Sequence, residues 1–212
     1  MIKAMIFDLD GTIGNTVPLC IKAFRKSIES LMSRNITDEE IVATFGPSEE
    51  GTIKALIPEQ YEEGVKQYLH YYREFHKECP KPFDGIVEVI RALKKKGILV
   101  AMVTGKGRKS VDITLDEFGM AGLFECIEAG SISGNVKCEG ITAVIEHFNI
   151  NPKEAYYIGD APTDIIAARN AGVGIISAAW ADLVYVEELK RLKPDQLFRT
   201  MKEFEEFIST HF

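Results

Sequence analysis

The organisation of the chain follows from one segment near its amino terminus, Ala4-Met5-Ile6-Phe7-Asp8-Leu9-Asp10-Gly11-Thr12. Its apolar run, residues 4–7, predicts a buried strand of the kind found in parallel sheets. Asp8 and Asp10 follow where the strand ends, and open α/β sheets bind their ligands beyond this end of their strands. Two carboxylates held so close repel each other unless a cation or a shared proton offsets their charge. The pair therefore indicates a hard divalent metal, and magnesium suits it best.

Composition narrows the class of protein. The 212 residues, 46% hydrophobic and 27% charged, are typical of a soluble globular protein with one large domain or a core that carries an insert. A net charge of −7 argues against a nucleic-acid partner. We find no long apolar segment and no signal-peptide pattern, so we expect a cytoplasmic protein without a membrane partner. The cysteines have no metal-type spacing and are expected to be reduced thiols: Cys20, Cys79, Cys126 and Cys138.

A helical insert is predicted directly after the first strand. Apolar residues recur there at helical spacing, and Thr37 with Glu40 forms a capping box. The predicted helices run from Pro18 to about Ser33, from Thr37, from Glu49 to about Leu56, and from Pro58 to about Cys79. The aromatic residues of the last helix are expected to form the core of the bundle. We therefore predict an α-helical cap of residues 15–80 within a core of residues 1–14 and 81–212.

Strands and helices alternate in the rest of the chain. Strands are predicted at residues 98–103, 124–129, 155–158, 173–177 and 195–198. Helices are predicted at residues 84–96, 109–118, 140–148, 164–170 and 203–208. This alternation predicts an α/β fold, a doubly wound parallel Rossmann-like sheet with the helical bundle inserted as a cap.

Polar residues also follow the second predicted strand. Thr104 offers a hydroxyl and Gly105 an exposed backbone N–H, a combination that can hold a phosphoryl oxygen. Lys137 precedes a predicted helix, where a lysine can neutralise carboxylates and bind phosphate as a point charge. Lys106 competes with Lys137 for that role.

A second acidic pair follows the strand at residues 155–158. Asp160 lies at the strand end and Asp164 at the start of the next helix, so both can point into one site. Asp164 also has a purely structural interpretation, because acidic residues are favoured near helix N-termini.

Together the four motifs resemble, in order, those of the haloacid dehalogenase-like phosphohydrolases. The first is the opening segment, the second is Thr104-Gly105, the third is Lys137, and the fourth is Gly159-Asp160-Ala161-Pro162-Thr163-Asp164. In many relatives proline follows the third-motif lysine, whereas here Cys138-Glu139-Gly140 follows. The resemblance implies the phosphoglycolate phosphatase-like branch, in which a helical cap follows the first strand.

The resemblance also implies roles for the acidic residues. Asp8 would attack phosphorus and become an aspartyl phosphate, and Asp10 would move protons to the leaving group and from water. Mg²⁺ would be held by Asp8, Asp160 and the backbone carbonyl of Asp10, with Asp164 binding it directly or through water. The acid at position 10 favours phosphate-ester or phosphomutase chemistry over cleavage of carbon–halogen or carbon–phosphorus bonds.

The phosphoryl group itself would contact three further residues. By the same resemblance, Thr104, the N–H of Gly105 and Lys137 would hold its oxygens. Relatives place a specificity loop in the cap, and here it comprises Gly46, Pro47, Ser48, Glu49 and Glu50. The two glutamates would discourage an anionic leaving group. Alternatively, Ser48 caps a helix whose dipole favours the two acids.

The expected function is a magnesium-dependent phosphatase that acts on a small phosphorylated metabolite: phosphoglycolate, a sugar phosphate, a nucleotide or pyrophosphate. One alternative is a phosphomutase of the β-phosphoglucomutase type, although the cap loop has no cluster of basic residues. Another is a non-catalytic phospho-aspartate binding or switch module. The sequence leaves open whether the protein is a monomer or a homodimer.

Overall fold

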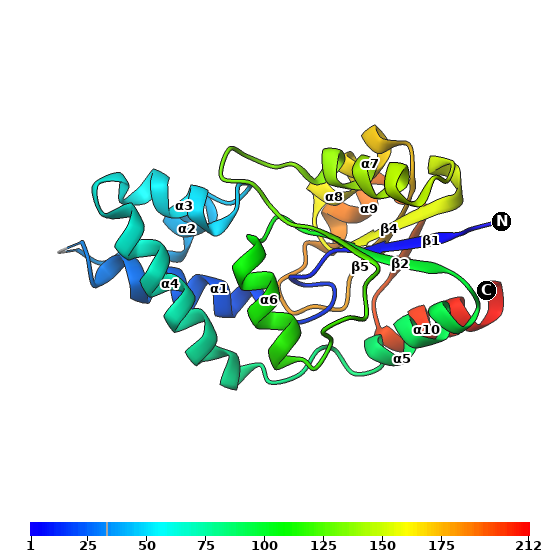
Figure 1. The fold of residues 1–212 in the computed structure, drawn as a ribbon, viewed down its shortest axis with the longest axis horizontal. Coiled ribbons are helices and arrows are strands. Elements are labelled where there is room, and N and C mark those ends of the chain that lie inside the picture. Colours follow the sequence, from blue (N-terminus) through cyan, green and yellow to red (C-terminus); the bar gives the residue numbers. More distant parts are fainter. Residues whose placement is uncertain (33) are drawn as a thin grey trace.

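A six-stranded parallel sheet lies in one part of the molecule, and the helices α1–α4 form the other (Figure 1). The computed structural model describes residues 1–32 and 34–212. The strand order is β3-β2-β1-β4-β5-β6, so the sequence order reverses between β1 and β4. Such a reversal opens a ligand-binding crevice beyond the carboxyl ends of the strands. The strands are β1 (Ala4–Phe7), β2 (Leu99–Val103), β3 (Cys126–Glu128), β4 (Ala155–Gly159), β5 (Gly174–Ala178) and β6 (Gln196–Phe198).

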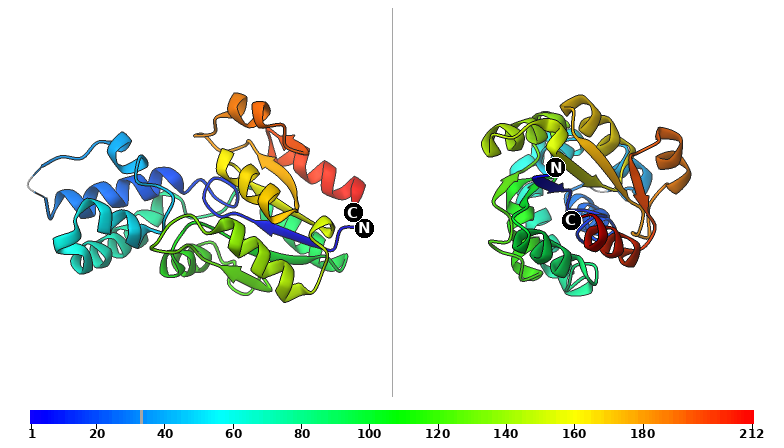
Figure 2. Two further views of the ribbon diagram at one scale, coloured as in Figure 1. Left: turned by 90° about the horizontal axis from the view of Figure 1, so that it is seen from above. Right: turned by 90° about the vertical axis from the view of Figure 1, so that its right-hand side faces the viewer.

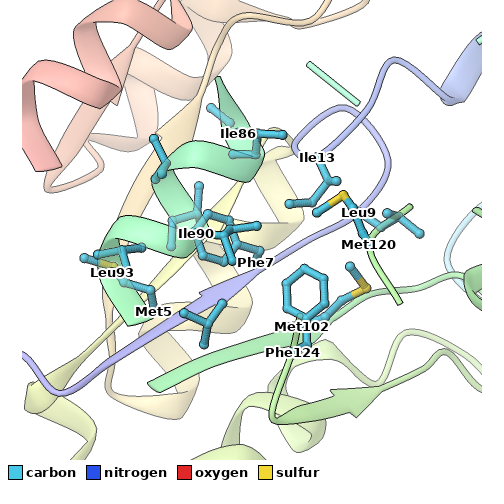
Figure 3. Packing of buried hydrophobic residues seen from close by; sticks show 14 of the residues in the cluster. Met5, Phe7, Leu9, Ile13, Ile86, Ile90, Leu93, Met102, Met120 and Phe124 are labelled. Atoms are coloured by element: carbon cyan, nitrogen blue, oxygen red, sulfur yellow. The ribbon is translucent and has the colours of Figure 1, made fainter. Parts of the chain in front are cut away.

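β1 is fully buried because helices cover both faces of the sheet. Side chains alternate along a strand, and here Met5 and Phe7 enter one apolar cluster while Ala4 and Ile6 enter another. The first cluster packs against helices that include α5, whose Ile90 lies beside Phe7 in Figure 3. The continuous apolar run at residues 4–7 therefore reflects two buried faces, and the predicted doubly wound fold is confirmed.

The helices of the core lie in two layers. α5, α6 and α10 contribute to the cluster around Phe7, and α7, α8 and α9 to the cluster around Ile6. The bounds are α5 (Ile86–Lys95), α6 (Arg108–Glu117), α7 (Lys137–Phe148), α8 (Pro162–Ala171), α9 (Val186–Leu192) and α10 (Met201–His211). The two chain termini lie near each other, at the end of the sheet away from the helical insert (Figure 2).

The segment between β1 and α5 is helical throughout its described secondary structure. It comprises α1 (Val17–Glu29), α2 (Asp38–Val42), α3 (Glu49–Leu56) and α4 (Tyr61–Phe75), with short 3₁₀ turns at Pro58–Gln60 and His76–Glu78. These helices share a third apolar cluster, in which Tyr68 and Tyr72 are almost fully buried. The aromatic residues of α4 thus belong to this core, as expected. Across residues 1–32 and 34–212, no helix has the length and apolar character that crossing a membrane requires.

Several predicted boundaries differ from the structure. α1 ends at Glu29, and the predicted end at Ser33 lies outside the described residues. α5 begins at Ile86 because Gly85 has a left-handed backbone (φ 93°), and α7 begins at Lys137, three residues before its predicted start. α9 was not predicted at all: Leu189 is its one buried side chain, so the segment has little apolar periodicity.

Candidate active site

The end of β1 presents two carboxylates to the crevice between β1 and β4. Asp8 extends the sheet pairing, because its backbone N–H donates to the Ile158 carbonyl at 2.8 Å. The chain then turns through Gly11, whose φ of +77° favours glycine. A side chain at Gly11 would collide with the carboxylate of Asp160. The glycine therefore lets the β1 turn and the β4 carboxylate lie side by side.

Three carboxylates and one ammonium meet at this point. Asp8, Asp160 and Asp164 each place one oxygen so that the three lie within 4.8 Å of one another. The Nζ of Lys137 lies 2.9 Å from Asp8 Oδ2 and 2.6 Å from Asp164 Oδ1. The other oxygen of Asp8, Oδ1, is buried and has no hydrogen-bond partner among the residues that the structure describes.

The charges of this cluster are unbalanced. Burial raises the pKa of Asp8 to about 6; the nearby Asp164 adds to the rise, and Lys137 opposes it. Burial also raises the pKa of Asp160 well above its usual range, and Asp164 and Asp8 raise it further. Lys137 alone therefore does not balance the negative charge of the three carboxylates. Their closely spaced oxygen atoms fit a hard divalent cation.

Residues from the other strand ends complete one side of a cavity of about 250 Å³. Thr104 is buried at the end of β2, and its hydroxyl accepts the backbone N–H of Lys106 at 3.3 Å. The core residues that line the cavity are Asp8, Asp10, Thr104, Gly105, Lys106, Asn135, Lys137, Asp160, Ala161 and Thr163. The structure therefore brings the predicted catalytic and phosphate-binding residues together with Asp160, while Asp164 lies behind them, bonded to Lys137.

The two candidate lysines contact different carboxylates. Lys137 bridges Asp8 and Asp164, whereas the Nζ of Lys106 lies 3.3 Å from Asp10 Oδ2. The other oxygen of Asp10 accepts a hydrogen bond from the Thr16 hydroxyl. Only Lys137 is thus in contact with the proposed metal-binding carboxylates, among the residues that the structure describes.

The predicted specificity loop divides into parts with different surroundings. Gly46, Pro47 and Glu49 line the cavity. Ser48 is the N-cap residue of α3, as expected, but its side chain makes no capping hydrogen bond. Its backbone N–H donates to the Ser131 carbonyl at 2.8 Å. Glu50 is half-exposed and is not among the cavity-lining residues.

Glu49 reaches from α3 to the start of α6. Its Oε2 accepts the backbone N–H of Gly107 at 2.7 Å, and its Oε1 accepts the hydroxyl of Ser110. Gly107 is the N-cap of α6 and has no side chain that caps the helix. Glu49 therefore supplies the cap from another part of the chain. Burial raises its pKa, whereas Lys106 lowers it.

The sequence did not identify the far wall of the cavity. That wall is largely apolar and comes from the helical insert: Val17, Cys20, Phe24, Phe45, Thr52 and Tyr68, beside the loop residues. An apolar residue at helical spacing looks the same in a sequence whether it faces a core or a cavity. Asn135 and Thr163 also line the cavity and were given no role, although Asn135 lies two residues before Lys137 and Thr163 lies within the fourth motif.

Comparison with known proteins agrees with this arrangement. A family model described as haloacid dehalogenase-like hydrolase matches residues 5–178. A Caldanaerobacter subterraneus protein provisionally named pyrophosphatase PpaX is 32% identical, over 94% of this chain and 91% of its own. The pyrophosphatase PpaX of Bacillus cereus is 28% identical, over 95% of this chain and 94% of its own length. A crystal structure of a predicted phosphoglycolate phosphatase from Haemophilus somnus has the same fold, with a TM-score of 0.79, 21% identity and 97% of both chains covered. The chain therefore belongs to the haloacid dehalogenase-like hydrolases.

Proposed function

We propose that this phosphatase hydrolyses a small phosphorylated metabolite through a covalent phosphoryl group on Asp8, with Mg²⁺ as its cofactor. The observation that carries the proposal is the environment of the Asp8 carboxylate. Lys137 holds Oδ2 at 2.9 Å, while Oδ1 is buried without a hydrogen-bond partner in the described chain. A carboxylate oriented by one oxygen, with the other unbonded, is prepared to act as a nucleophile.

Asp8 Oδ1 would attack the phosphorus atom. An oxygen–phosphorus bond to Asp8 forms while the bond to the leaving oxygen breaks. Water then attacks the phosphorus, releasing phosphate and regenerating the carboxylate. Phosphoryl transfer depends mostly on positioning and on stabilising the charge of the phosphoryl oxygens. Thr104, the N–H of Gly105 and Lys137 line the cavity beside Asp8 and would supply that stabilisation.

The metal would be bound by Asp8, Asp160 and the backbone carbonyl of Asp10, with Asp164 as a direct or water-mediated ligand. When bound, it offsets the charge of the carboxylates and of the phosphoryl oxygens. The short distances among the three carboxylates and the raised pKa values of Asp8 and Asp160 support this assignment.

Asp10 would transfer the protons. It lines the cavity two residues after the nucleophile, and neither of its oxygens contacts Lys137 among the contacts described. As an acid it would protonate the leaving oxygen, and as a base it would then take a proton from the attacking water. Two carboxylates in one site would thus have separate roles.

Substrate choice would be made by the cap, residues 15–80, against the core of residues 1–14 and 81–212. A cavity of about 250 Å³ suits a small leaving group. The names of the relatives suggest pyrophosphate and phosphoglycolate as substrates, and a sugar phosphate or nucleotide remains an alternative. A phosphomutase is less well supported, because the described cavity residues from the insert include no arginine or lysine that would bind a second phosphate.

The test is a panel of phosphorylated metabolites that includes pyrophosphate and phosphoglycolate, assayed with and without Mg²⁺. We expect turnover with at least one of them, which Asp8→Asn abolishes and Asp112→Asn, an exposed position on α6, does not. Folded protein that binds Mg²⁺ but turns over no member of the panel would favour the non-catalytic switch module instead.

A further inference from the structure

Lys106 is a buried cation that the proposed mechanism leaves without a role. It follows β2 by three residues, and only 2% of its side chain is exposed. Its Nζ lies 3.3 Å from Asp10 Oδ2 and 3.1 Å from the sulfur of Cys20. The same Nζ lies 4.3 Å from the ring centroid of Tyr72. A core lysine thus ends among side chains of α1 and α4.

Only one of these contacts neutralises the ammonium. Burial raises the pKa of Cys20 to about 12, with a further contribution from Asp10, so its thiol is uncharged at neutral pH. The face of Tyr72 attracts a cation but bears no charge. Asp10 is therefore the carboxylate within ion-pair distance of Lys106 among the described residues, and separating the two would cost the buried ammonium its direct ion-pair partner.

Asp10 is correspondingly fixed through both oxygens. Oδ1 accepts the Thr16 hydroxyl and lies 3.7 Å from Cys20 Sγ, and Oδ2 faces Lys106. Thr16 and Cys20 lie on or beside α1 of the insert, whereas Lys106 belongs to the core. The orientation of the carboxyl group therefore depends on the insert being packed against the core.

We propose that Lys106 is a positioning residue, which orients Asp10 toward the leaving oxygen and makes that orientation depend on the packing of α1 against the core. The inference rests on the proposed function. It extends that function by linking proton transfer to the packing of α1 and α4 around one core ammonium.

The chemistry of the leaving group separates this role from others. When Asp8 forms its bond to phosphorus, the leaving oxygen departs with the electron pair of the broken bond and takes a proton from Asp10. An alkyl ester needs that proton, because an alkoxide is a poor leaving group. A 4-nitrophenyl ester hardly needs it, because the phenolate is stable. A disoriented Asp10 should therefore slow the reaction of the alkyl ester far more than that of the 4-nitrophenyl ester.

The experiment compares kcat/KM for an alkyl phosphate, phenyl phosphate and 4-nitrophenyl phosphate in holoenzyme with Mg²⁺. Lys106→Met keeps the aliphatic stem and removes the charge, and Lys106→Gln is a second neutral variant should the first fold poorly. General acid catalysis contributes about 10²–10⁴-fold, and we expect loss of its positioning to cost roughly 30-fold or more with the alkyl ester. The loss with 4-nitrophenyl phosphate should stay within about threefold. The matched control is Lys109→Met, at an exposed lysine of α6, which should change neither value.

Asp10→Asn provides the reference pattern. It should show the same dependence on leaving group, and adding Lys106→Met to it should cause little further loss, because two residues that act through one group are not additive. An equal loss with all esters would overturn the proposal, as would a rise in KM confined to pyrophosphate or phosphoglycolate. If Asp8→Asn abolishes turnover while Lys106→Met shows either result, the proposed function stands and only this inference fails.

Discussion

The hydrogen bonds of Glu49 join α3 of the insert to α6 of the core, and they give a quantitative prediction. Glu49→Ala removes a carboxylate that accepts two hydrogen bonds. One comes from the Gly107 N–H at 2.7 Å, and the other comes from the Ser110 hydroxyl. Hydrogen bonds to charged groups contribute about 1.5–3 kcal/mol each, and buried donors left without partners lose about 1–3 kcal/mol. Water from the adjacent cavity would recover part of this. We expect the docked arrangement to lose about 2–3 kcal/mol.

The assay is hydrogen exchange at the start of α6, followed by mass spectrometry. The Gly107 amide is held by Glu49, so its exchange should accelerate roughly 30- to 150-fold in Glu49→Ala, the factor that corresponds to about 2–3 kcal/mol. Glu49→Gln keeps an oxygen acceptor and should show a much smaller change. Glu59→Ala, at an exposed residue before α4, is the control for loss of a glutamate. Equal exchange in Glu49→Ala and in the unaltered protein would refute this interpretation of the contact.

Three further predictions concern stability. Because burial raises the pKa of Asp8 from 3.8 to about 6, the folded metal-free protein binds more protons than the unfolded chain in that interval. The stability of the metal-free protein should therefore fall as pH rises through that interval. Mg²⁺ should raise Tm more at pH 7 than at pH 5, and an increase in Tm that does not depend on pH would contradict this prediction. Burial lowers the pKa of His76, so its contribution to stability is lost as pH falls below about 6.5. His76→Gln should reduce the slope of the unfolding free energy between pH 7.5 and 5.5 in urea titrations, and an unchanged slope would rule out that contribution. Ile90→Ala, at a fully buried position in the cluster around Phe7, should lower the unfolding free energy by about 2–5 kcal/mol, and a loss near zero would show that the cluster repacks.

The sequence predicted the core fold well because its signals are local. An apolar run followed by acidic residues marks β1 and β4, and the carboxyl ends of neighbouring parallel strands meet at one edge. The positions of Asp8, Asp160 and Lys137 follow from that rule together with the family resemblance. α9 was missed for the opposite reason, because its one buried residue gives no periodic pattern.

The contacts between insert and core could not be predicted from local pattern. Glu49 and Gly107 are 58 residues apart, and Lys106 and Cys20 are 86 apart. Such pairs form only through the docking of α1, α3 and α4 against the loops that follow β2. The sequence offered Glu49 a role either against an anionic leaving group or on a helix dipole, and it did not reveal the buried contact observed. It also left Lys106 as a rival of Lys137 rather than a partner of Asp10.

The central claim is that Asp8 carries the phosphoryl group, and a rapid acid quench during turnover tests it most directly. Mass spectrometry of the quenched protein should find one added phosphoryl group on the peptide that contains Asp8, and hydroxylamine should remove it, as expected of an acyl phosphate. Asp8→Asn should show neither the modification nor the activity. Asp10→Asn should still show the modification when it is quenched during turnover of 4-nitrophenyl phosphate. Turnover in Asp8→Asn at the rate of the unaltered enzyme, or a phosphoryl group on another residue, would contradict the account.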